Sequence, residues 1–429
     1  MKLVSQFQLP TIRIVSFRDQ AIRWLLLAAL GAAGCATHSR RNAQRAPDWD
    51  AVQETVQVTL PPASIVAPEP VLAPPPGGPP AQTMGDIGRQ PSRLTDHSPA
   101  SRFEAPLLSR SALSSANPAL RPGWVGLARW CRENRLPPPA CVTLAPLPAY
   151  VLKTGEANLL LRTGSQAAFW DGLELRLGSA PQMIDDQPFV HSLDLAKTIR
   201  PLLGYGPGNL PGSFRISPVI VVDPGHGGEN SGTRSVLDGN YEKVFTLDWA
   251  LRLERLLVTN GWQVFLTRSN DVNLTISNRV AFAEEHKAGL FLSLHFNSAG
   301  EDDSQAGLET YCLTPCGMTS TVTRGYSDDS TLSFPNNAYD EQNLQLACLV
   351  HRALLQVNGN HDRGVRRARF PGVLRGQQRP AILIEGGYLS NPREARLIGD
   401  PAYREKLAEA LAKALGAVRR EVASAKRGE

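Results

Sequence analysis

The sequence predicts an α/β protein, in which a mostly parallel, twisted sheet is flanked by helices and preceded by a small α+β domain. Residues 218–223 form a continuous apolar run, which is typical of a parallel strand buried on both faces. Residues 242–259 carry apolar side chains at helical spacing. From Ile216 onward, strand-like and helix-like segments alternate, a pattern that indicates helices packed on a mostly parallel sheet.

The remaining elements of this C-terminal part follow the same alternation. Asn260-Gly261 ends the helix 242–259. Further strands are expected at 262–267, 290–295, 307–313 and 381–385, and further helices at 276–286, 341–356 and 402–422. Together these elements predict one domain over residues 216–424.

A shorter globular segment, residues 122–205, precedes that domain. We expect a short helix, then three stretches that alternate like strands with tight turns, and finally a capped helix. In chain order these are 124–134, 157–162, 167–177, 181–190 and 192–203. This segment is the predicted small α+β domain.

The N-terminus has the features of an exported protein. Four basic residues precede an apolar run, 24–33, which is too short to span a bilayer and is typical of a signal-peptide core. The run ends in Leu30-Gly31-Ala32-Ala33-Gly34-Cys35, which resembles a bacterial lipoprotein cleavage box, although Ala32 stands where Leu is usual. Residues 1–34 are therefore predicted to be a signal peptide and Cys35 the lipid-bearing first residue. Plain secretion is the alternative.

Residues 35–121 are rich in Pro, Ala and Ser, without apolar periodicity, and are predicted to be a disordered tether. Ala36 follows Cys35 in place of an aspartate, which by analogy with bacterial lipoproteins favours anchoring in the outer membrane, facing the periplasm.

Nucleic acid is not an expected partner, because the net charge is only +5 and no basic stripe with aromatic residues occurs. The five other cysteines lack CxxC spacing, and their pairing stays open.

Four residues in the C-terminal domain carry the expected chemistry. His226, His295 and Glu385 each sit at the end of a predicted strand, and Glu242 lies in the first turn of a predicted helix. Because ligands in such folds bind beyond the carboxyl ends of the strands, we expect the four to converge. Two histidines and one glutamate make a catalytic zinc set with a position left for water, and a further carboxylate supplies a general base.

The region from about Ser217 to Ala417 resembles the zinc-dependent N-acetylmuramoyl-L-alanine amidases of bacteria. Seven stretches carry the resemblance, in order along the chain: 222–228 (VDPGHGG), 241–243 (YEK), 266–268 (LTR), 293–298 (SLHFNS), 307–311 (GLETY), 362–365 (DRGV) and 384–391 (IEGGYLSN). The segment 122–205 resembles the copper amine oxidase-like N-terminal domain found beside wall hydrolases. That second resemblance implies no copper, because His191 is the only histidine of the segment.

The first resemblance implies one zinc ion per chain, held by His226, Glu242 and His295, and Glu385 as the catalytic carboxylate. It implies peptidoglycan as the substrate, cleaved at the amide between the lactyl group of MurNAc and L-Ala. Two alternatives remain open: a zinc peptidase acting on the stem peptide, and a non-catalytic wall-binding lipoprotein. An activator protein is conceivable, but nothing in the sequence identifies one.

Other polar residues near the expected site receive structural interpretations. Asp223 is expected to be a turn residue, with orientation of a metal ligand as the less favoured role, and three more residues are expected to brace loops in preference to contacting substrate: Arg268, Arg279 and Asn297. Structural roles are also expected for His191, His286, His351 and His361. The insertion 316–340 contains no glutamate and no apolar helical period, so it is predicted to be a rim loop and not an inhibitory plug.

Overall fold

The computed structural model describes residues 55–56, 122–142, 147–155, 157–203, 216–325, 327–357 and 361–425. The predicted signal peptide, Cys35 and the predicted tether lie outside these ranges, except for the two residues of β1 (Thr55–Val56). No helix within these ranges combines the length and the apolar content that a membrane crossing requires.

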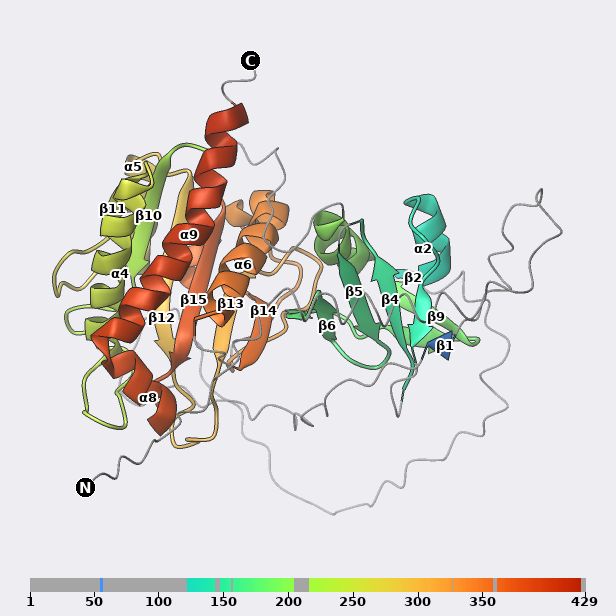
Figure 1. Ribbon diagram of the computed structural model, residues 1–429, viewed down its shortest axis with the longest axis horizontal. Coiled ribbons are helices and arrows are strands. Elements are labelled where there is room, and N and C mark those ends of the chain that lie inside the picture. Colours follow the sequence, from blue (N-terminus) through green and yellow to red (C-terminus); the bar gives the residue numbers. More distant parts are fainter. Residues whose placement is uncertain are drawn as a thin grey trace, which may run out of the picture.

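The described strands of the larger lobe, shown in yellow-green to red in Figure 1, form a mostly parallel sheet. They are β10 (Val219–Pro224), β11 (Gln263–Leu266), β12 (Leu290–Asn297), β13 (Leu308–Leu313), β14 (Asp362–Ala368) and β15 (Ala381–Tyr388). Their order is β14-β13-β15-β12-β10-β11, and only the pair β13–β15 is antiparallel. The predicted α/β class is confirmed.

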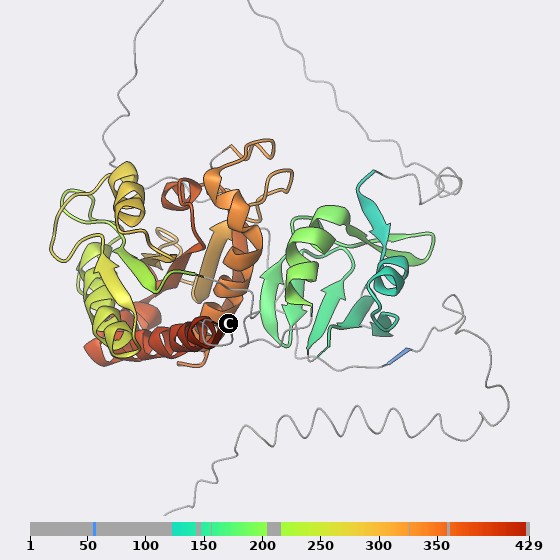
Figure 2. The same ribbon diagram turned by 90° about the horizontal axis from the view of Figure 1, so that it is seen from above.

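Helices cover both faces of this sheet, with α5 and α9 on opposite sides in Figure 2. One face packs against α4 (Glu242–Thr259), α6 (Asp340–Leu355), α8 (Pro392–Gly399) and α9 (Pro401–Ala425), and the other against α5 (Ile276–Glu285) and α7 (Gly372–Arg375). Strand β10 is apolar from residue 219 to residue 222 because both of its faces are buried. Ile220 and Val222 belong to the first core, and Val219 and Val221 to the second, so each successive side chain is buried on alternate faces.

The smaller lobe is built mainly from antiparallel strands. Its elements are β2 (Trp124–Gly126), α2 (Leu127–Glu133), β3 (Ala140–Val142), β4 (Ala149–Lys153), β5 (Asn158–Arg162), β6 (Ala167–Trp170), β7 (Leu173–Arg176), β8 (Gln182–Ile184) and β9 (Gln187–His191). Strands β3 to β7 form a meander, and β2, β9 and β8 form a separate small sheet.

Two helix predictions in this lobe need correction. The segment 124–134 begins as strand β2, paired with β9, and becomes helical only at Leu127. The segment 192–203 changes pitch along its length, from α3 (Ser192–Asp194) through the π-helical η3 (Leu195–Ile199) to the 3₁₀ turn η4 (Arg200–Leu202). Its cap is the ring of His191, which accepts a hydrogen bond from the amide of Leu193 at 3.4 Å.

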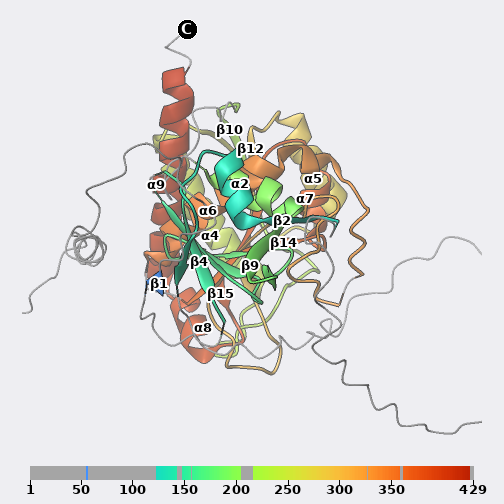
Figure 3. The same ribbon diagram turned by 90° about the vertical axis from the view of Figure 1, so that its right-hand side faces the viewer.

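The two lobes are joined along the sheet, and Figure 3 looks along this arrangement with the smaller lobe in front of the larger one. Leu175 of β7 pairs in parallel with Val365 of β14, so β7 continues the larger lobe's sheet. Polar contacts flank this pairing: the amide of Glu174 donates to Asp362 at 2.9 Å, and Arg352 donates to the carbonyl of Trp170 at 2.9 Å. A single apolar cluster includes buried residues of both lobes.

Substitution of Gly364 tests the packing of β7 against β14. This residue has a φ of +90°, and a Cβ at this position would lie 3.1 Å from the carbonyl oxygen of Glu174 in β7. Gly172 is a matched control, because its φ of +81° is similar but the space around its missing Cβ is open. Both Gly→Ala changes should lose about 1–2 kcal/mol to the left-handed backbone. Gly364→Ala should lose about 1 kcal/mol more through crowding.

Urea unfolding of the full chain measures the difference between the two variants. Equal losses of unfolding free energy in Gly364→Ala and Gly172→Ala would contradict the packing of β7 on β14.

Candidate metal centre

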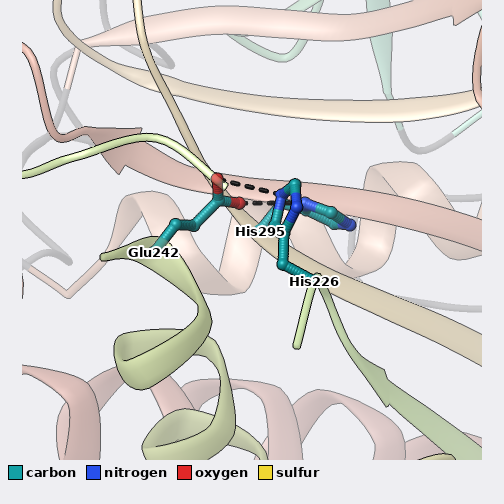
Figure 4. Close-up of side chains that lie close together, drawn as sticks. All are labelled: His226, Glu242 and His295. Atoms are coloured by element: carbon teal, nitrogen blue, oxygen red, sulfur yellow. Dashed lines mark hydrogen bonds and ion pairs between the residues drawn. The ribbon is translucent and has the colours of Figure 1, made fainter. Parts of the chain in front are cut away.

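Three side chains that are far apart in the sequence meet at one end of the sheet (Figure 4). His226 follows β10, His295 lies in β12, and Glu242 is the first residue of α4. One ligand atom from each lies within 4.8 Å of the others. Nε2 of His226 is 3.0 Å from Oε2 of Glu242, and Nδ1 of His295 is 2.9 Å from Oε1 of the same carboxylate. The predicted convergence of these three residues therefore occurs in the structure.

Glycines make room for these side chains. A Cβ at Gly225 would lie 2.3 Å from the ring of His295, and one at Gly232 would lie 2.6 Å from the carboxylate of Glu242. The backbone of His226 itself is left-handed, with a φ of +62°. That conformation is uncommon for a residue with a side chain, and it clusters at functional sites.

The ligand side chains are oriented by further hydrogen bonds. Nδ1 of His226 lies 2.7 Å from Oδ1 of Asn230, which fixes this nitrogen as the donor and leaves Nε2 for a metal. The carboxylate of Glu242 also accepts from the amides of Thr233 and Phe296, each at 3.1 Å. The cluster is therefore held in place before any ion is bound.

His226 and the carboxylate of Glu242 shift each other's pKa values because they lie close together. Burial lowers the pKa of His226, but the adjacent Glu242 carboxylate and the hydrogen bonds outweigh it and raise that pKa to about 9. Burial raises the pKa of Glu242, but His226 and His295 outweigh it and hold that pKa far below its usual range. A cation that binds these three residues would therefore compete with a proton on His226.

Glu385 lies beside this cluster because of strand register. His295 of β12 and Glu309 of β13 are both paired with Glu385 of β15, so three strands place a titratable side chain at one level. Glu385 is 5% exposed, and burial raises its pKa. Among the described contacts its buried Oε2 has no hydrogen-bond partner.

Glu309, to which the sequence assigned no role, is a buried carboxylate. Arg363 approaches it at 2.8 Å and Arg366 at 3.4 Å, and Asn297 and the hydroxyl of Tyr311 donate to it at 2.8 and 2.6 Å. Burial raises its pKa, but the guanidinium groups outweigh this effect and hold the pKa at about 2. The expected bracing role of Asn297 therefore consists of orienting Glu309.

The bracing roles expected for two arginines are also seen. Arg268 donates to the carbonyls of Gly225 and Lys243 at 2.8 and 2.9 Å, and Arg279 donates to the carbonyl of His226 at 2.7 Å.

The interpretation of Asp223 as a turn residue is wrong. Its carboxylate is buried at the end of β10, where it accepts from Arg279 and from two hydroxyl groups, those of Thr267 and Ser293.

The other histidines have structural surroundings, as predicted. His286 ends α5, with Nδ1 2.8 Å from the carbonyl of Phe282. His351 is fully buried and bonded to Thr310 and Asp362. The side chain of His361 is exposed.

The described part of the insertion 316–340 is mostly irregular, with one 3₁₀ turn, η5 (Pro335–Tyr339). It does reach the site, however, through a residue that the sequence did not single out. Nη2 of Arg324 lies 3.5 Å from Oε1 of Glu385. An isolated arginine in a Ser- and Thr-rich loop carries no pattern that would have identified it.

Comparison with known proteins gives this region a family. Residues 220–417 match the N-acetylmuramoyl-L-alanine amidase family. AmiC of Neisseria meningitidis serogroup B, an N-acetylmuramoyl-L-alanine amidase, is 31% identical over 239 residues, which cover 51% of this chain and 55% of that protein. The amidase AmiA of Escherichia coli is 29% identical over 215 residues, 45% of this chain and 73% of that protein. The chain thus spans about half the length of the Neisseria relative.

Among solved structures, the catalytic domain of CwlV, an N-acetylmuramoyl-L-alanine amidase from Bacillus (Paenibacillus) polymyxa var. colistinus, is 33% identical. The match covers 46% of this chain and 95% of that domain, with a TM-score of 0.38.

The metal centre can be tested by zinc binding. His226→Asn keeps a residue that tolerates the left-handed backbone, and His295→Ala removes the second nitrogen ligand. Both variants should lose most of their zinc, measured by elemental analysis, because two remaining ligands hold the ion far less tightly. His361→Ala, which changes an exposed histidine, should retain it. Stoichiometric zinc in both site variants would show that the ligands are elsewhere.

Zinc affinity should also depend on pH. Because the raised pKa of His226 keeps it protonated below about 9, zinc must displace that proton. Affinity should therefore rise by up to about tenfold per pH unit from pH 7 toward 9 and then level off. Calorimetry at pH 7.5 in buffers of different ionisation enthalpy should detect release of about one proton per zinc ion. No proton release would contradict this charge state.

Proposed function

The chain belongs to the N-acetylmuramoyl-L-alanine amidase family, and on this premise we propose that it hydrolyses the amide between the lactyl group of MurNAc and L-Ala of the stem peptide in peptidoglycan. The observation that carries the proposal is the convergence of His226, Glu242 and His295 beside the buried Glu385. Three metal-binding side chains with a neighbouring carboxylate are what hydrolysis by an activated water requires.

One zinc ion per chain is the proposed cofactor, with His226, Glu242 and His295 as its ligands. The donor set suits zinc, and one ligand atom from each residue already lies within 4.8 Å of the others. Glu385 is the proposed general base, because it is adjacent in register to His295 and has an oxygen without a described partner.

The proposed reaction assigns a separate task to each residue. Bound zinc would lower the pKa of a water toward 7 and polarise the amide carbonyl. Glu385 accepts the proton of the attacking water and then delivers it to the leaving amine. Asn230 and Arg279 keep His226 in place, the first through its ring and the second through its backbone carbonyl. Burial of Glu385 keeps competing bulk water away from the carboxylate.

The variant Glu385→Gln distinguishes between two roles of Glu385, general base and metal ligand. The amide of Gln keeps the shape of the side chain but cannot take the proton. Turnover should fall by roughly 10²–10⁴. Zinc content should stay near one per chain, which elemental analysis of the same preparation would check. Joint loss of zinc and activity would make Glu385 a ligand, and near-normal turnover would remove it from the mechanism.

The products distinguish the proposed activity from the two alternatives. Mass spectrometry of digested peptidoglycan should find free stem peptides with an N-terminal Ala. Shortened peptides would indicate a zinc peptidase, and the absence of products would indicate a wall-binding lipoprotein. The second alternative gives no reason for a carboxylate to lie beside the metal ligands.

The remaining proposals concern the N-terminal half. Residues 1–34 are proposed as a signal peptide, 35–121 as a tether, 122–205 as a copper amine oxidase-like N-terminal domain with a spacer or wall-targeting role, and 216–424 as the catalytic domain. The relatives named as peptidoglycan amidases support export to the cell envelope. We place the protein in the periplasm, anchored to the outer membrane through a lipid on Cys35.

The anchor can be tested by metabolic labelling with a fatty-acid analogue. The wild type should be labelled and Cys35→Ser should not be, because the thiol of Cys35 is the proposed attachment atom. Cys316→Ser, which removes an exposed thiol elsewhere in the chain, serves as the control and should remain labelled. Equal labelling of wild type and Cys35→Ser would rule out the anchor.

A further inference from the structure

A cavity of about 210 Å³ lies beside the row of residues that leads from Glu385 to Glu309, and Glu309 is part of its lining. It lies on the β13 side of Glu385, whereas His295 lies on the β12 side, because β15 runs between these two strands. Residues 320–325 of the rim loop form one wall. The rest of the lining includes the polar side chains of Asn297, Gln305, Glu309, Arg363 and Tyr388. The space is large enough for several water molecules or one small polar group.

Arg324 is the residue that connects this cavity with the reacting centre. It lines the cavity, its Nη2 lies 3.5 Å from Oε1 of Glu385, and its guanidinium stacks over two aromatic rings, those of Tyr311 and Phe370. Its backbone is left-handed, with a φ of +48°, which costs about 1–2 kcal/mol for a residue with a side chain. The loop thus adopts an unfavourable backbone conformation at the residue whose guanidinium lies beside Glu385.

The loop is fastened on both sides of Arg324. On one side Thr321 exchanges two hydrogen bonds with the backbone of Arg367, at 2.9 and 3.0 Å. On the other side Asp328 forms a 2.5 Å ion pair with the buried Arg369 and accepts from the amide and hydroxyl of Ser320. These contacts fix the position of the guanidinium.

The neighbouring carboxylates do not account for this position. Glu309 already has Arg363 at 2.8 Å and Arg366 at 3.4 Å, and Arg324 lies farther away, at 3.9 Å. The contact with Glu385 is also long for a charge-assisted hydrogen bond. All described polar contacts of Arg324 use Nη2. A planar guanidinium presented in this way matches an incoming carboxylate, which it binds through two parallel hydrogen bonds.

We propose that Arg324 and the cavity it lines form a subsite for a carboxylate on the peptide part of the substrate. This inference rests on the proposed amidase function, and it assigns to the rim loop a role in substrate selection. Of the two parts of that substrate only the peptide supplies the carboxylate, because the lactyl carboxyl group is consumed in the amide bond. Arg324 then holds the peptide side of the bond next to Glu385, where the leaving amine must take up its proton.

Two synthetic muramoyl dipeptides test the subsite: one with a free peptide carboxylate and one with that group converted to a carboxamide. Arg324→Ala should raise KM for the acid by about ten- to a hundredfold, as expected for a lost charged hydrogen bond. KM for the carboxamide should change less than twofold. Arg324→Lys should fall between wild type and alanine, because an ammonium keeps the charge without the planar fork. Arg255→Ala removes an exposed arginine of α4 and should leave both KM values unchanged.

Other outcomes would overturn the inference. Equal loss on both substrates would mean that Arg324 acts only through Glu385, and a gain on both would mean that the loop inhibits the enzyme. If the wild type cleaves neither substrate, the proposed function fails. Calorimetric binding of the acid and the carboxamide to wild type and Arg324→Ala then still decides the subsite: a preference for the acid that disappears in the variant supports it, and equal binding contradicts it.

Discussion

The carboxylate of Glu242 is the interaction on which the site depends. It is 4% exposed, and its two oxygens contact His226 from the loop after β10, His295 from β12, and two backbone amides. A buried carboxylate without partners costs several kcal/mol, so any backbone arrangement that separates these groups is strongly disfavoured. The loop after β10, the end of β12 and the start of α4 are therefore held in one register by a single side chain.

The register of the sheet is the second constraint on the site, because it determines which side chains lie next to one another on neighbouring strands. Residues that are paired across neighbouring strands project side by side from the same face of the sheet. His295, Glu385 and Glu309 follow one another across β12, β15 and β13, so the proposed metal ligand, the proposed base and a carboxylate with a lowered pKa form a row. Arg363 and Arg366 neutralise the far end of this row, and the repulsion that Glu309 would otherwise exert on Glu385 is reduced.

Strands and helices could be predicted from the sequence wherever a buried face requires apolar residues at regular spacing. Strands such as β10 are apolar on both faces, and α4 begins and ends at the predicted residues 242 and 259. Strand β14 was not predicted, because its arginines are buried against acidic partners and carbonyls, and hydropathy gives no signal for such a strand. The three proposed metal ligands could be predicted because each lies at or near the end of a recognisable strand or helix. The place of Arg324 could not, because it depends on the φ of one loop residue and on distant anchors such as Arg369.

The joining of β7 to β14 limits how such a chain can be rearranged during evolution. A module connected by a linker alone can be exchanged or lost with little consequence for its neighbour. Here the smaller lobe covers what would be the edge of the larger lobe's sheet, and one apolar cluster extends through both. Removing the smaller lobe would leave β14 with unpaired backbone groups and would expose apolar side chains near Val365, which invites aggregation. The two lobes are therefore expected to be inherited together.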